Sequence, residues 1–138
     1  RTLSMEEFIL GNRKTAKKQG ELVSNILVPH PGKNAFGNFE KLGIRAYLVI
    51  SIVMVGVVAE LNEQDEILNL KVAVGACSPV AQRLRLLEKE CVGQRLKSIE
   101  IHPKHLELLD PIDDVRASAN YRNAVVPELL KRAITGVV

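Results

Sequence analysis

The residues able to bind metals are few and widely spaced in this 138-residue sequence. His102 and His105 flank Pro103, a spacing that could suit metal ligation, but no third ligand is close and the proline disrupts the helix that would align them. The acidic run from Asp110 to Asp114 could hold a hard cation or cap the following helix. Capping and dipole complementarity are the more common role, so we expect no metal site.

Nucleophilic catalysis has equally little support from the residues. Ser51, Cys77 and Ser78 have no evident base partner that would activate a hydroxyl or a thiol. Gly75 stands between a strand pattern and a helix pattern, but one glycine is not a phosphate loop, and neither the dinucleotide fingerprint nor the P-loop occurs. By chemistry alone, the sequence therefore shows no catalytic residues.

Lys41 and Arg45 are the one suggestive pair. They stand in the segment Phe39-Glu-Lys-Leu-Gly-Ile-Arg45, directly before the most apolar stretch of the chain. Two cations at the mouth of a rigid element could face a ligand, since binding residues concentrate in loops held by a scaffold. They could also be solvated cations flanking a turn, and composition alone favours this second interpretation.

The apolar stretch that follows organises the rest of the chain. No residue from Leu48 to Ala59 is charged, and seven of the ten residues from Val49 to Val58 are Val or Ile. Branched side chains favour a strand, and apolar residues in both registers predict that it is covered on both faces. Twelve uncharged residues are short of the roughly 20 that a membrane helix needs, so we expect no membrane partner.

Periodicity and breaker residues predict the remaining elements. A helical turn capped by Ser4 opens the chain, and a helix from Pro79, capped by Ser78, closes at Gly93. Pro127 predicts a kink or break in the last helix. The other predicted elements are strands over 21–28, 48–59 and 67–76, the last two forming an antiparallel hairpin, a weaker helical region over 96–109, and a helix over 118–134.

Strands in the first half and helices in the second predict an α+β fold. We expect one domain over residues 1–138, with a small antiparallel sheet of about three strands and about three helices packed on one face. Helices on one face leave the other face of the sheet uncovered, and that face could dock on another domain.

Charge and cysteine content narrow the choice of partner and compartment. The net charge is +3, with an excess in Arg13, Lys14, Lys17 and Lys18, which is more typical of a solvated face than of a nucleic-acid site. With three Phe, two Tyr and no Trp, few aromatic side chains could stack on bases, so we expect no nucleic-acid partner. Two cysteines fit no disulfide framework, and reduced thiols suit a cytoplasmic protein.

Several short blocks, taken in order, resemble the C-terminal domain of the FAD-binding medium subunit of molybdenum hydroxylases, the xanthine dehydrogenase and carbon monoxide dehydrogenase family. No single block is specific, but their order and spacing cover nearly the whole chain. The blocks are Phe8–Thr15, Gly20–Pro29, Phe39–Arg45, Gly75–Pro79 and Asp113–Arg122.

The resemblance implies an oxidoreductase subunit that is not active as this chain alone. It implies FAD as cofactor, an upstream FAD-binding domain that this sequence does not contain, and two partners, a molybdenum-binding large subunit and a 2Fe-2S small subunit. The domain would close the FAD site and contribute to electron transfer from iron–sulfur clusters to FAD. The alternative is a free-standing protein-interaction module derived from that domain, without cofactor.

The resemblance also implies roles for the two cations. In the family, the lysine of the F-x-K block approaches the isoalloxazine ring, so Lys41 is expected to face the flavin, with Arg45 as a second cofactor-binding residue. A cation at that position could favour an anionic reduced flavin, tuning the cofactor and not performing the chemistry.

Overall fold

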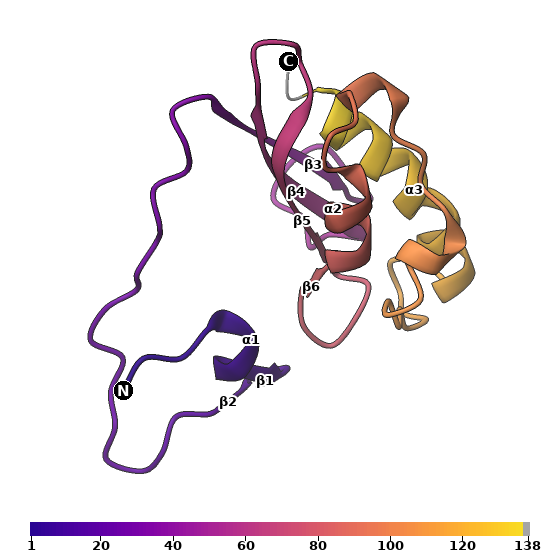
Figure 1. Ribbon diagram of the computed structural model, residues 1–138. Coiled ribbons are helices and arrows are strands. Elements are labelled where there is room, and N and C mark those ends of the chain that lie inside the picture. Colours follow the sequence, from indigo (N-terminus) through magenta and orange to yellow (C-terminus); the bar gives the residue numbers. More distant parts are fainter. Residues whose placement is uncertain (137–138) are drawn as a thin grey trace.

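The computed structural model describes residues 1–136, which form an antiparallel sheet, helices on one of its faces, and a separate N-terminal hairpin (Figure 1). The sheet has four strands in the order β3-β4-β5-β6. The elements are α1 (Met5–Phe8), β1 (Ile9–Gly11), β2 (Lys14–Thr15), β3 (Ala35–Leu42), β4 (Val53–Leu61), β5 (Ile67–Gly75), β6 (Gln82–Arg83), α2 (Arg85–Cys91), the 3₁₀ turns η1 (Leu96–Ser98) and η2 (Pro103–His105), and α3 (Ala119–Thr135).

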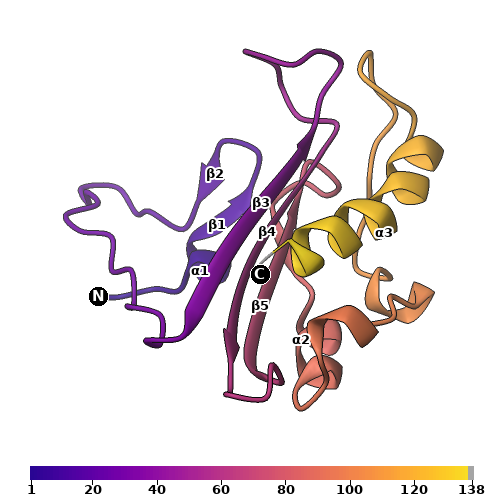
Figure 2. The ribbon, with the colours of Figure 1, turned by 90° about the horizontal axis from the view of Figure 1, so that it is seen from above.

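The N-terminal elements lie apart from the sheet. Ser4 caps α1 with a capping box in which its hydroxyl accepts from the Glu7 backbone N–H, as predicted. Seen from above, these N-terminal elements lie on one side of the sheet, and α2 and α3 lie on the other (Figure 2). An ion pair between Glu6 and Arg85, 2.9 Å long, joins α1 to α2.

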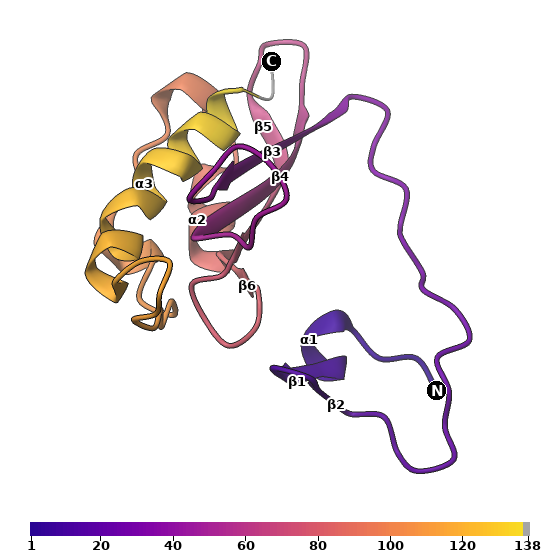
Figure 3. The same ribbon diagram turned by 180° about the vertical axis from the view of Figure 1, so that it is seen from behind.

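The strand predicted over residues 21–28 is wrong for this structure. Residues 21–32 belong to no helix or strand, and they run as an extended connection between the N-terminal hairpin and β3 (Figure 3). The composition suits a strand, but a strand exists only where a neighbour pairs with its backbone, and none does so within residues 1–136.

The predicted strand over 48–59 is right only from Val53 onward. β3 ends at Leu42, β4 begins at Val53, and the intervening residues form a loop in which Leu48 is 95% exposed, while Ser51 and Ile52 at its end are buried. The two strands pair in register, and the Ile52 N–H donates to the Leu42 carbonyl across the base of the loop. A single apolar run thus supplies both a loop and a strand, which composition alone does not separate.

β4 is covered on one face only, so the prediction of two covered faces is wrong within residues 1–136. Its odd-numbered residues from Val53 to Leu61 are buried beneath the helices, whereas Val58 is 38% exposed on the opposite face. The predicted hairpin of β4 with β5 is confirmed, with Val57 opposite Val72.

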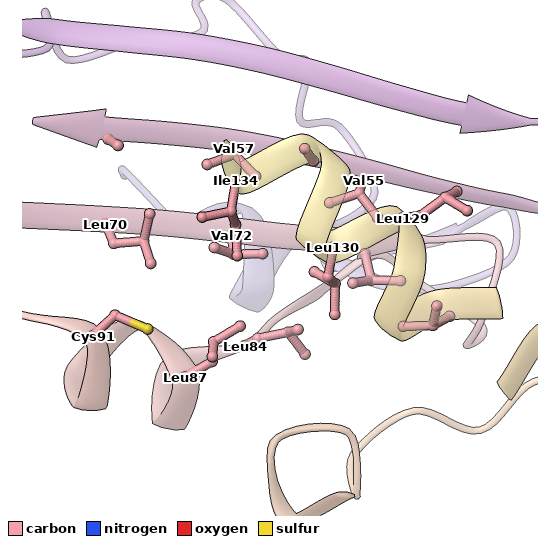
Figure 4. Close-up of a cluster of buried hydrophobic side chains, with 14 of the residues drawn as sticks. Val55, Val57, Leu70, Val72, Leu84, Leu87, Cys91, Leu129, Leu130 and Ile134 are labelled. Carbon is pink, nitrogen blue, oxygen red and sulfur yellow. The ribbon is translucent and has the colours of Figure 1, made fainter. Parts of the chain in front are cut away.

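The core fills the space between the sheet and the helices (Figure 4). Strand residues such as Val55 and Val72 meet Leu87 of α2 and Leu130 of α3, and all four are fully buried. Burial on this scale is the main source of stability. The helices pack on one face of an antiparallel sheet, so the predicted α+β class is confirmed, with β6 as a fourth, short strand.

The helix ends differ from the prediction at two places. α2 begins at Arg85 and not at Pro79, because Gln82 and Arg83 pair with β5 before the helix starts. Gly93, with φ +80°, lies just beyond its C-terminus, as predicted. The weaker helical region is reduced to η1 and η2.

The last helix is confirmed, with the Ser118 hydroxyl accepting from the Tyr121 N–H as its N-cap. The helix continues through Pro127, so the structure shows no break there. Leu129 and Leu130, in the turn after Pro127, are both buried. Their packing stabilises the helix although Pro127 has no backbone N–H to donate.

Candidate functional site

The loop from Gly43 to Ile52, which we call the β3–β4 loop, is the most exposed apolar segment of the sheet domain. Its exposed side chains are Ile44, Tyr47, Leu48 and Ile50. Leu48 adopts φ 49°, a left-handed conformation that a leucine rarely takes. Exposed apolar side chains on a loop held in this way are typical of a surface that another molecule covers.

Arg45 lies within this loop, and Lys41 lies just before it, near the end of β3. Lys41 lies one residue before the end of β3, opposite Met54, and its Nζ donates to the Val49 carbonyl at 2.8 Å. Arg45 donates from Nη2 to the Leu48 carbonyl, also at 2.8 Å. The structure thus brings the two cations to one exposed loop, where each holds a loop carbonyl.

A buried arginine fixes the base of the same loop. Arg122, from the first turns of α3, is 1% exposed and donates from Nη1 to the carbonyls of Ile52 and Ala76. Its Nη2 pairs with Asp114 at 2.7 Å. Arg122 therefore joins the start of β4, the end of β5 and the loop before α3.

Asp114 is the centre of this network. Burial opposes its ionisation, but hydrogen bonds from Arg116 and Ala117 and the charge of Arg122 outweigh that effect and lower the pKa of Asp114 to about 2. Arg116 also donates from Nη1 to the Ser51 carbonyl at 3.4 Å. Asp114 thus orients two arginines onto consecutive carbonyls at the end of the β3–β4 loop.

Sequence reasoning missed this network. The block Asp113–Arg122 supported the resemblance, yet no role was assigned to its residues. The available signal was an Asp and two Arg placed on either side of the Ser118 helix cap, where a side chain from the first helical turn can reach back to the preceding loop.

The other sequence candidates have structural roles. His105 is buried, its Nδ1 accepts from the His102 backbone N–H at 3.0 Å, and its Nε2 meets Glu90 at 2.9 Å. Asp113 accepts from the Ala119 N–H at the start of α3, which agrees with the predicted capping. Within the described residues, no three His, Cys, Asp or Glu side chains gather as a metal site would require.

The two cysteines and Ser78 do not show the features of activated nucleophiles. Burial raises the pKa of Cys77 to about 11, although the charge of Arg122 opposes this, and burial with the Glu90 charge raises that of Cys91 to about 11. Ser78 does not cap a helix; its hydroxyl accepts from the Asp110 N–H at 3.1 Å.

The uncovered face of the sheet carries a shallow depression of about 690 Å³. Its floor is formed by small residues, Gly56 of β4 and Ala73 of β5, and a Cβ atom added at Gly56 would meet nothing within 4 Å. Phe39, Lys71 and Arg83 stand at its rim, and the Arg83 guanidinium is held by Glu88.

Most of this fold belongs to a known class of flavoprotein domain. The family model described as CO dehydrogenase flavoprotein C-terminal domain matches residues 39–137, which is most of the chain. The chain therefore belongs to this family, as the resemblance implied. A search among curated proteins found no match.

Solved structures of a quinoline 2-oxidoreductase and of CO dehydrogenases share this fold. The chain matches quinoline 2-oxidoreductase from Pseudomonas putida 86 with a TM-score of 0.84 and 19% identity, over 99% of this chain and 48% of that chain. It matches a reconstituted CO dehydrogenase from Oligotropha carboxidovorans with a TM-score of 0.80 and 20% identity, over 95% of this chain and 46% of that chain. The chain thus spans about half the length of these neighbours.

Among residues 1–136, no helix is both long enough and apolar enough to cross a membrane.

Proposed function

We propose that this domain closes one side of the FAD site in the flavin subunit of a molybdenum hydroxylase and contributes to electron transfer from iron–sulfur clusters to FAD. The observation that carries the proposal is the family match over residues 39–137. The match begins at Phe39, two residues before Lys41, and leads directly into the exposed β3–β4 loop.

The residues present suit the ring of a flavin better than its phosphates. Lys41 and Arg45 supply two exposed cations, and Tyr47 and Leu48 supply exposed apolar surface beside them. A planar, largely apolar ring that gains negative charge on reduction suits such a set. Residues 1–136 contain no glycine-rich loop leading into a helix that would cradle a pyrophosphate. The chain would cover the ring, while an upstream FAD-binding domain would hold the cofactor.

FAD, when bound, supplies the two-electron chemistry that connects the iron–sulfur clusters to an acceptor. In this proposal Lys41 and Arg45 contribute charge, and Arg122 and Asp114 keep the loop that carries them in place. Lys41 would exchange its hydrogen bond with the Val49 carbonyl for an interaction with the ring. No acid or base of this chain takes part in the chemistry.

The proposed assembly adds two partners, a molybdenum-binding large subunit and a 2Fe-2S small subunit. Support comes from the neighbours, which include a Cu,Mo-CO dehydrogenase matched with a TM-score of 0.82 and 22% identity. The large subunit would choose the hydroxylated substrate, and this domain would contribute to the flavin end of the electron path in a cytoplasmic complex.

The test is the flavin reduction potential of the subunit purified from its own cell. We expect bound flavin in the wild type, and Lys41→Met should lower the midpoint potential by some tens of millivolts, since about 30 mV corresponds to roughly 1.4 kcal/mol for a two-electron couple. Lys97→Met removes another exposed lysine, from η1, and should leave the potential unchanged. Absence of flavin, or equal potentials in both variants, would contradict the proposal.

A protein-interaction module without cofactor is the second candidate. It is favoured by one observation, the uncovered sheet face with its depression of about 690 Å³. A colourless protein that binds a partner through this face would support it, and stoichiometric flavin would exclude it.

A further inference from the structure

The connection from Leu22 to Val28 has the composition of a strand but no sheet. Leu22 is 80% exposed and Val28 is 83% exposed, and both are large apolar side chains. The exposed apolar residues of the segment are Leu22, Val23, Ile26, Leu27 and Val28. Five such side chains in seven residues are unusual on a surface that stays in water.

The backbone of this segment is also unpaired. No backbone hydrogen bond joins residues 22–29 to another residue of 1–136. Val and Ile favour extended backbone, and Pro29 and Pro31 stop any continuation of a ladder. The segment therefore presents both the side chains and the free N–H and C=O groups that strand addition needs.

We propose that residues 22–28 add as an edge strand to a β-sheet of the flavin-binding half of the subunit. This inference rests on the proposed function and specifies how the two halves are joined. The apolar side chains would be buried against the core of that half. The β3–β4 loop and this strand would then be two separate points of attachment to it.

The length of the structural neighbours supports this choice of partner. Quinoline 2-oxidoreductase is matched over 99% of this chain, so residues 22–28 belong to the matched fold, yet the match covers only 48% of that chain. More than half of the neighbour thus lies outside the matched part and can supply a sheet. The segment runs away from the body of this domain in both views (Figures 1 and 3), which argues against pairing with its own β3.

The first test is hydrogen exchange on the complete flavin-loaded subunit. We expect every second amide of residues 22–28, the set that faces the partner strand, to exchange about as slowly as those of β4, and far more slowly than those of the exposed loop at Ile112 and Asp113. Both standards lie in the same molecule, so no isolated fragment is needed.

The second test uses the alternation of a strand. Neighbouring amides point to opposite sides, so of the single variants Ile26→Pro and Leu27→Pro only one removes a donor that faces the partner sheet. We expect that one variant to lose its protected amides over 22–28, while the other keeps them. A patch held by apolar contact alone would not distinguish adjacent prolines.

A side-chain control accompanies the proline pair. Val23 and Val92 are both 54% exposed, and Val92 lies just beyond α2. Val23→Asn should weaken the association of the two halves, whereas Val92→Asn should not.

The outcomes separate this inference from the function on which it rests. Bound flavin with rapidly exchanging residues 22–28, or equal effects of the two prolines, would overturn the strand and leave the proposed function standing. Absence of flavin from the subunit would overturn both. Protection found only in a flavin-free dimer of this chain would identify a second copy as the partner and overturn the inference.

Discussion

The two faces of the sheet are built from alternate residues of the same strands, yet they differ in almost every property. On the face beneath α2 and α3, Val57 is 3% exposed, and on the opposite face its neighbour Val58 is 38% exposed. The side chains on the covered face are mostly large and branched, such as Val55 and Val72, whereas the open face has the small residues Gly56 and Ala73 at its centre.

This difference indicates which residues serve the fold. Apolar burial between sheet and helices stabilises the domain, and Arg122 joins that layer to the base of the β3–β4 loop. The open face and the exposed loop contribute little to stability, so their composition is free to suit a partner. Three pairs of substitutions test this division, from the largest expected effect to the smallest.

Arg122→Met should be the most damaging change. It removes one partner of a buried ion pair and leaves the Ile52 and Ala76 carbonyls without their donor, at a cost of roughly 3–5 kcal/mol in the free energy of unfolding. Arg132→Met removes an exposed pair with Glu128 from the same helix and should cost below about 0.5 kcal/mol. Urea unfolding of both variants measures the difference.

The dependence of stability on acid pH tests the Arg122–Asp114 pair independently. The pKa of Asp114 is about 2 in the folded chain, against an ordinary value of 3.8, so its stabilising effect is complete above pH 3.8 and is lost as the pH falls through about 2. Arg122→Met removes one cause of the low pKa, so stability should fall less steeply with acid in the variant. Parallel acid curves for the two proteins would show that the pair is not coupled.

Val57→Ala and Val58→Ala compare the two faces directly, because they make one change at adjacent positions of β4. Val57→Ala should cost about 2–3 kcal/mol through lost burial and a cavity. Val58→Ala should cost about 0.5–1 kcal/mol, mainly through strand preference. Equal losses in denaturant unfolding would show that the second face is also covered in solution.

The sequence predicts the covered face well and the open one poorly, for a physical reason. The hairpin of β4 with β5 and the caps at Ser4 and Gly93 follow from local rules, and all of them occur in the structure. Whether an apolar residue meets a neighbour is not local. Leu48 and Ile26 are as apolar as core residues, yet they are exposed, because what would cover them does not belong to residues 1–136.

The candidate site was predicted in part for the same reason. The sequence pointed to Lys41 and Arg45 as a pair, and in the structure Arg45 lies in the β3–β4 loop while Lys41, near the end of β3, donates to a carbonyl of that loop. Their approach to a flavin stays a prediction. The anchoring role of Arg122 was not predicted, since its partners Ile52 and Ala76 are 70 and 46 residues away and offer only backbone carbonyls, which leave no trace in sequence.

Gly56→Ala should have the smallest effect, and in the favourable direction. An added Cβ meets no atom within 4 Å, and Gly56 has no positive φ, so alanine loses less conformational entropy on folding and should stabilise by about 0.4–1 kcal/mol. Gly93→Ala is the control, because φ +80° there strains any L side chain and should destabilise by about 1–2 kcal/mol. Melting curves of the two variants measure both. A destabilised Gly56→Ala would mean that something already packs on this face, whereas a stabilised one means that the fold itself does not require glycine there.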